Sequence, residues 1–183
     1  AAGFHIIAVV LFYWLLRRRY QVHCVPACSA TLLLAAWEPI RTQVFTAQEA
    51  PLLLCLFVTS LYLLSAEPTA RAARLSGAMA AGMLPLVRPD GLFLTVLLMI
   101  LYLGTRGRRL NGDDVRQCAA AAVCFLGPVL LLSLFRLVYF GDVLPNTYYL
   151  KVTNRPGRLE YGLAYVSRFL KTFYGTLLIL PLL

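Results

Sequence analysis

The chain has 183 residues, of which 60% are hydrophobic and only 14% carry a charge. Soluble domains usually contain about 45–50% apolar and about 25% charged residues, so the composition argues against a water-soluble globular fold and against a disordered chain. The 17 basic and 8 acidic residues give a formal charge of +9. In a membrane protein, such an excess of positive charge usually lies in the loops that face anionic lipid. The composition therefore predicts a polytopic membrane protein.

Seven apolar segments follow one another along the chain. They cover residues 3–16, 22–37, 50–66, 75–87, 92–103 and 118–140, and the last begins near residue 169. Crossing about 30 Å of hydrocarbon takes about 20 helical residues, and fewer when a helix is re-entrant. We therefore predict an all-α polytopic membrane protein with about seven transmembrane or re-entrant helices. Both ends of the chain are apolar without polar flanks, so we expect an internal piece of a longer protein, truncated at both ends.

Loop charges predict which side of the membrane each loop faces. Nine basic residues fall on alternate loops, which the positive-inside rule places in the cytoplasm. They are Arg17, Arg18, Arg19, Arg71, Arg74, Arg106, Arg108, Arg109 and Arg116. Eight basic residues then belong to the outer side, and five of these crowd between Lys151 and Lys171. This outer excess favours an anionic ligand on that side.

The tetrapeptide Arg88-Pro89-Asp90-Gly91 separates two short apolar runs. Pro fixes φ and Gly tolerates φ > 0, so the sequence predicts a tight turn between two helices. One interpretation is a hairpin with a solvated Arg88–Asp90 pair. The other is that Arg88 presents its guanidinium to a phosphate at the membrane surface while Asp90 orients it.

The stretch RLVYFGDVLPNTYYLK (136–151) combines charges, aromatic rings and an amide beside lipid. Gly141 and Asp142 are expected to end the preceding helix, with aromatic rings just before them at the interface. It suits a site for a lipid-linked anionic sugar, and equally an ordinary interfacial loop with a snorkelling Arg136.

Other features predict packing rather than chemistry. Cys24 and Cys28 lie one helical turn apart beside His23, but a fourth ligand is missing, so we expect no metal site. The small residues of the segment 77–82 allow close helix contact. Soluble nucleotide-binding and hydrolase signatures are absent from the sequence.

Four motifs in order resemble those of a known enzyme class. They are QEAPLLL (48–54), LVRPDGL (86–92), FRLVYFGDVLPNTYYLK (135–151) and GLAYVSRF (162–169). Together they resemble the GT-C class of polytopic glycosyltransferases, and within it the branch that contains the mycobacterial terminal arabinofuranosyltransferase and its bacterial relatives. The sequence differs from that branch before Glu49, where G-[LM]-E reads Ala47-Gln48-Glu49.

The resemblance implies a single transmembrane GT-C-like domain over 1–183, whose first outer loop and C-terminal region are missing. Such enzymes move a sugar, with inversion, from a polyprenyl-phosphate donor to a glycan or protein acceptor on the outer side of the bacterial cytoplasmic membrane. The family's catalytic base lies in that first outer loop, upstream of residue 1, so the piece by itself is expected to be inactive. No cofactor is evident beyond the lipid-linked donor, the need for a divalent metal stays open, and nucleic acid is not an expected partner.

Within this interpretation each candidate residue has a role. A lipid phosphate leaving group carries charge into the transition state, and fixed cations stabilise it. We expect the donor phosphate to contact Arg88 and Lys151, with Arg136 assisting. The residues expected to shape the pocket or orient these groups are Glu49, Asp90, Asp142, Asn146, Tyr148 and Tyr149. The alternative is a non-enzymatic transporter or flippase of lipid-linked glycans, whose broken helices and outer basic cluster would form a translocation site.

Overall fold

The architecture was analysed in a computed structural model of the chain. The structure describes residues 1–37, 42, 44, 49–67, 69–106, 112–142 and 160–168. Throughout these residues the regular structure is helical and no strand occurs, which confirms the all-α prediction for the part described. A further helical stretch covers residues 160–168.

The helices follow the apolar segments in chain order. They are α1 (Ala2–Trp14), a short π-helix η1 (Leu15–Arg19), α2 (Cys24–Ala36), α4 (Ala50–Leu64), α5 (Arg71–Gly82), α6 (Leu84–Val87), α7 (Gly91–Arg106) and α8 (Gly112–Phe140). Six of the seven expected segments are thus helical, and the seventh, from residue 169, lies outside the described residues.

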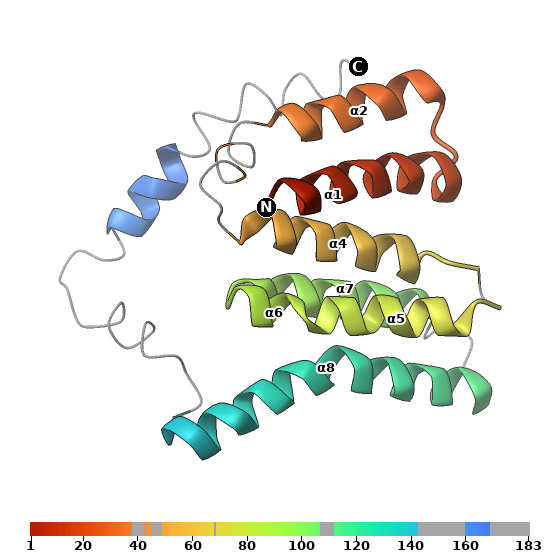
Figure 1. Ribbon diagram of the computed structural model, residues 1–183. Coiled ribbons are helices and arrows are strands. Elements are labelled where there is room, and N and C mark those ends of the chain that lie inside the picture. The colour runs from red at the N-terminus through yellow and green to blue at the C-terminus, as the bar shows by residue number, and fades with distance from the viewer. Residues whose placement is uncertain are drawn as a thin grey trace.

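Helices that follow one another along the chain run in alternate directions, and they pack in a row in the order α2, α1, α4, α5 and α8, with α7 beside α5 and α6 (Figure 1). This alternation gives the row two ends. We call the "RPDG end" the one where α6 ends and α7 begins, around Arg88–Gly91. We call the "arginine end" the one where η1 ends and α5 and α8 begin, which holds Arg71, Arg74 and Arg116.

Two helix boundaries differ from the predicted segments. The helix expected over 75–87 begins at Arg71. A hydropathy criterion excludes the charged residues before residue 75, but arginine is a good helix former, so the helix extends through them. It is also interrupted at Met83, after which α6 starts with a proline in its first turn. Pro85 carries no N–H to continue the hydrogen-bond ladder of α5, and a proline is well tolerated at the start of a new helix.

Small residues bring α5 close to both of its neighbours, as predicted from the segment 77–82. A Cβ on Gly77 would lie 2.9 Å from the backbone nitrogen of Leu64 on α4, and a Cβ on Gly82 would lie 2.6 Å from the carbonyl oxygen of Cys124 on α8. The core is built beside these crossings, between α5, α6, α7 and α8. Its buried residues are Ala78, Ala81, Leu84, Leu98, Tyr102, Ala121 and Phe125.

One helix of the described part is long and apolar enough to cross a membrane, the stretch Val115–Phe140 of α8. Only 17% of its most apolar 18-residue window is buried in the molecule, so its apolar side chains face outward rather than into a core. The apolar helices Cys24–Ala36, Ala50–Leu64 and Gly91–Gly104 are shorter than a full span. Phe140 ends α8, and Gly141 follows with φ of +74°, the left-handed conformation that commonly stops a helix.

Candidate functional site at the RPDG turn

Backbone hydrogen bonds close the turn between α6 and α7. The Arg88 N–H donates to the Leu84 carbonyl at 3.1 Å, and the Gly91 N–H donates to the Arg88 carbonyl at 2.9 Å. Behind the turn the buried Thr95 hydroxyl lies 2.6 Å from the Ala81 carbonyl and 3.1 Å from the Gly91 carbonyl. Because Ala81 belongs to α5, Thr95 fixes the start of α7 against α5. The tight turn predicted from the sequence is confirmed.

Gly91 is needed in this turn for a different reason from the one expected. No positive φ occurs at Gly91, since Gly141 is the one glycine of the described chain with that conformation. Instead, a Cβ at Gly91 would lie 2.5 Å from the carbonyl oxygen of Leu84. Only a residue without a side chain lets α7 start this close to α6.

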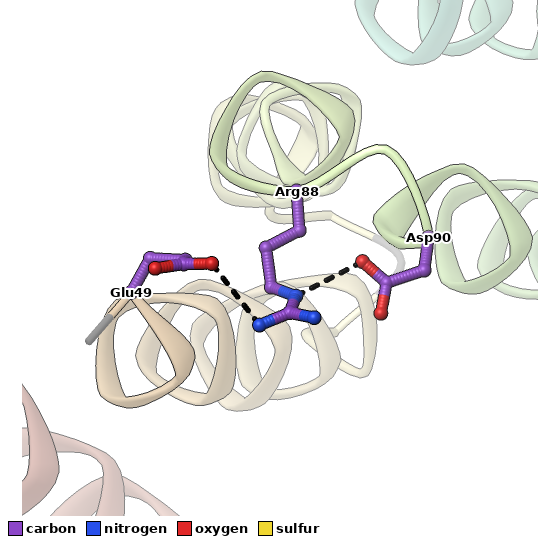
Figure 2. A network of polar contacts seen from close by, with 3 residues as sticks. All are labelled: Glu49, Arg88 and Asp90. Atoms are coloured by element: carbon purple, nitrogen blue, oxygen red, sulfur yellow. Dashed lines mark hydrogen bonds and ion pairs between the residues drawn. The ribbon is translucent and has the colours of Figure 1, made fainter. Parts of the chain in front are cut away.

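Arg88 lies between two carboxylates that come from separate helices (Figure 2). Its Nη1 donates to Glu49 Oε1 at 3.1 Å, and its Nε donates to Asp90 Oδ1 at 3.0 Å. The side chains are partly open to solvent, with exposed fractions of 33% for Arg88, 51% for Glu49 and 60% for Asp90. We call these three residues the Arg88 network. Glu49 and Arg88 are 39 residues apart in sequence, so the fold brings two of the expected motifs together.

Each charge of the Arg88 network suits the helix end where it lies. Glu49 immediately precedes α4 and makes no side-chain cap of its own, and Asp90 immediately precedes α7. Carboxylates are favourable near the positive end of a helix dipole, and a cation is favourable at the negative end, where Arg88 follows α6. The network is therefore electrostatically self-consistent, and its formal charge is −1.

The network fixes the guanidinium while leaving part of it available. Nε and Nη1 each have a carboxylate partner, and Nη2 makes no hydrogen bond to any residue within the described ranges. A planar guanidinium has five N–H donors, so the Nη2 side can still donate to an oxyanion. The Arg88–Asp90 pair, which both sequence interpretations contain, is present, and the phosphate-binding role of Arg88 stays a prediction.

The other expected site residues divide into two groups. Arg136 and Asp142 lie at or near the C-terminal end of α8, and neither shares a hydrogen bond or ion pair with the Arg88 network. The remaining candidates lie outside the described residues, and their roles stay predictions. They are Lys151, Asn146, Tyr148 and Tyr149.

Exposed aromatic rings surround the end of α8. Phe135 stacks on Tyr139 with ring centroids 5.5 Å apart, and Phe140 meets Tyr139 edge-on at 4.7 Å. All three are more than half exposed. Amphipathic rings of this kind concentrate where hydrocarbon meets water, in line with the sequence expectation for this end of the helix.

Sequence reasoning missed the polar contact between Arg74 and Gln117. Arg74, expected as a solvated loop charge, is only 1% exposed, and its Nη2 donates to Gln117 Oε1 of α8 at 2.9 Å. A signal for this existed, because Arg71 and Arg74 are three residues apart and share one face of a helix. The pairing with Gln117, 43 residues later, has no local signal.

No group of three or more His, Cys, Asp or Glu side chains within the described ranges could hold a metal ion. Cys24 and Cys28 do lie near each other, with 3.9 Å between their sulfur atoms.

The chain was also compared with known proteins. No protein-family model, no curated protein and no solved structure matches it significantly.

Proposed function

We propose that the chain is part of a multi-pass membrane glycosyltransferase of the GT-C kind. It takes a sugar from a polyprenyl-phosphate donor and transfers it, with inversion, to a glycan or protein acceptor on the outer side of a bacterial cytoplasmic membrane. The outward-facing apolar side chains support a membrane setting, since residues such as Phe93, Val138 and Val25 are more than three-quarters exposed. Such surfaces are rare on soluble monomers.

The observation that carries the proposal is the contact between Glu49 and Arg88. Glu49 and the RPDG turn are two separate motifs of the sequence resemblance, and the fold joins them by a 3.1 Å ion pair. A solvated hairpin would need only Arg88 and Asp90. The additional carboxylate from α4 holds the guanidinium in one place, which is what a positioned phosphate-binding group requires.

The proposed role of Arg88 is to stabilise the phosphate that leaves the sugar. Negative charge builds on that phosphate in the transition state, and a fixed guanidinium stabilises it without reorganising. Because the Arg88 network has a formal charge of −1, Arg88 alone does not make the site attractive to an anion. The donor site therefore needs a second cation, and Lys151 is our candidate, with Arg136 assisting.

Transfer assays with the intact protein test the proposal. The probes are polyprenyl-phosphoryl arabinofuranose and a polyprenyl-phosphoryl hexose, each supplied with membrane glycan as acceptor. We expect Arg88→Ala to lower transfer by at least about 100-fold, the usual loss when one transition-state donor is removed. Lys151→Ala should cause a similar loss. Arg88→Lys should retain intermediate activity, because it keeps the charge but not the planar fork.

Arg18→Gln is a matched control, since Arg18 stacks over the Trp14 ring at 3.9 Å at the arginine end, far from the turn. It removes one positive charge and should leave transfer unchanged. Wild-type transfer rates in both Arg88→Ala and Lys151→Ala, at normal expression, would refute the assignment of the site.

A further inference from the structure

Two cysteines at the start of α2 lie side by side, one helical turn apart. The Cys24 and Cys28 sulfur atoms are 3.9 Å apart, and the Tyr13 hydroxyl of α1 lies 3.9 Å from the Cys24 sulfur. Both thiols are free and exposed. We call Cys24 and Cys28 the thiol pair. It lies at the arginine end, because α2 follows η1 along the chain (Figure 1).

The spacing of the thiol pair does not suit a disulfide. Cβ atoms four residues apart on a helix are about 5–6 Å from each other, whereas a disulfide needs about 3.5–4.5 Å between them. Forming a disulfide would therefore distort the first turn of α2, where the Ala27 N–H donates to the His23 carbonyl at 3.1 Å. The two sulfur atoms are better placed to share a third atom that lies between them.

The number and kind of ligands select the ion. Structural zinc sites take four ligands, and within the described ranges no further His, Cys, Asp or Glu side chain joins the thiol pair to make a group of three. Copper(I) is a soft ion that prefers thiolate sulfur and accepts as few as two ligands. With metal–sulfur bonds of about 2.3 Å, two sulfurs at the observed separation enclose an angle of about 115° at the ion, and moving them about 0.7 Å further apart makes the arrangement linear.

The surroundings of the thiol pair favour a negatively charged complex. Arg17 Nη1 donates to the Val22 carbonyl at 2.8 Å, which places the guanidinium close to the start of α2. Cys24 is the first residue of that helix, and its first turn contains no acidic residue. The positive end of the helix dipole therefore lies at the thiol pair. One copper(I) held by two thiolates has a net charge of −1, so both features stabilise the bound form.

We propose that the thiol pair binds copper(I). The ion displaces the proton of each thiol and forms two copper–sulfur bonds, and the two protons pass to water. The oxidation state of copper does not change and no disulfide forms, so the step needs neither an oxidant nor a reductant. The site does not depend on the proposed transferase activity, because the Arg88 network lies at the other end of the helices.

Copper binding can be measured on the intact protein in detergent, under anaerobic conditions and without any sugar donor. The probe is copper(I) supplied as its bicinchoninate complex, whose colour fades as the protein takes up the ion. We expect the wild type to take up one equivalent, and X-ray absorption at the copper edge to show sulfur ligands. No uptake of copper, or copper bound through nitrogen or oxygen alone, overturns the proposal.

Serine variants test whether the thiol pair is responsible. Cys24→Ser and Cys28→Ser each remove one sulfur ligand and should lower the affinity at least about 100-fold, the upper end of the loss caused by removing only an outer partner of a metal ligand. The matched control is Cys118→Ser with Cys124→Ser, which removes two thiols from α8 and leaves the thiol pair intact. The control should take up copper as the wild type does. Equal losses in the control, or wild-type uptake in both single variants, overturn the proposal.

Thermal unfolding separates loss of the ion from loss of the fold. Both thiols are exposed, so each single variant should unfold within about 2 °C of the wild type when copper is absent. Copper(I) should raise the unfolding midpoint of the wild type and of the Cys118/Cys124 control, but not that of the single variants. Equimolar zinc should not displace the copper, because two ligands do not make a tetrahedral zinc site. Displacement by zinc would overturn the assignment to copper(I).

Discussion

The two ends of the bundle use arginine in opposite ways. At the RPDG end Arg88 follows a helix C-terminus and has two carboxylate partners within 3.1 Å. At the arginine end Arg71 and Arg74 occupy a helix N-terminal turn that has no acidic residue. The first arrangement agrees with the helix dipoles and the second opposes them. Arg88 is therefore paired with carboxylates that its own helix ends supply, whereas the first turn of α5 supplies none to Arg71 and Arg74.

The two ends also differ in how much their arginine contacts contribute to the stability of the fold. The Arg88 ion pairs are partly exposed, and exposed pairs usually contribute about 0–1 kcal/mol to stability. The Arg88 network is therefore a weak source of stability, which agrees with the ligand-binding role that we propose for it. Arg74 is buried, so its hydrogen bond to Gln117 contributes to folding.

Gly82→Ala is expected to have the largest effect, because it separates α5 and α8 where their backbones lie closest. The new Cβ would lie 2.6 Å from the Cys124 carbonyl, so α5 and α8 must move apart, at a cost of about 3 kcal/mol. Thermal unfolding in detergent measures it. Gly104→Ala is the matched control, since its Cβ meets nothing within 4 Å, and it should stabilise the helix by about 0.5–1 kcal/mol. Equal stability of the two variants would contradict the close α5–α8 crossing.

Gly91→Ala should have the next largest effect, and it acts on the other end. Its Cβ would lie 2.5 Å from the Leu84 carbonyl, so the turn must open, at a cost of about 2 kcal/mol. Transfer activity should fall with stability, because Arg88 moves relative to Glu49. Wild-type transfer by a less stable Gly91→Ala protein would contradict the dependence of Arg88 on this turn.

Gln117→Leu should destabilise the protein by about 1.5 kcal/mol, since it removes a hydrogen bond to a buried charged group. Gln117→Glu retains the acceptor and serves as the control. The thermal unfolding midpoints of both variants should be compared with that of the wild type. A leucine variant as stable as the wild type would show that the Arg74–Gln117 bond contributes nothing to folding.

Glu49→Gln should have the smallest effect on stability, about 0.5 kcal/mol, because the pair is half exposed. A double-mutant cycle with Arg88→Gln measures the coupling, which should vanish near 1 M salt, where the Debye length is about 3 Å. A coupling above about 2 kcal/mol that survives high salt would mean that the network is a buried structural element. The RPDG end would then contribute strongly to stability, contrary to the comparison above.

Much of the fold could be predicted from hydropathy. The apolar segments locate α1, α2, α4, α7 and α8, because each helix buries or presents an apolar surface along its whole length. Close packing of α5 could also be predicted, because small residues such as Gly77 and Gly82 at helical spacing leave room for another backbone. The split at Met83 was not predicted, although Pro85 carries its signal.

The site could be predicted only in part. The pair Arg88–Asp90 is local and follows from a tight turn. The contacts Glu49–Arg88 and Arg74–Gln117 join residues 39 and 43 positions apart, and no periodicity in a single sequence encodes which helices become neighbours. Arg74 was assigned to a solvated loop because hydropathy ends a segment at a charge, whereas the helix continues through it and α8 covers it.

The contact at Gly91 has a consequence for how the RPDG sequence should be read in other chains. Its glycine is required by the close spacing of two helix backbones, whereas its arginine and aspartate form an ion pair. The motif therefore combines two independent requirements. A match to all four residues indicates a tight turn between two helices, and it does not by itself indicate a catalytic site. A chain that keeps the glycine but has no acidic residue just before the helix that corresponds to α4 would retain the turn without the three-residue network.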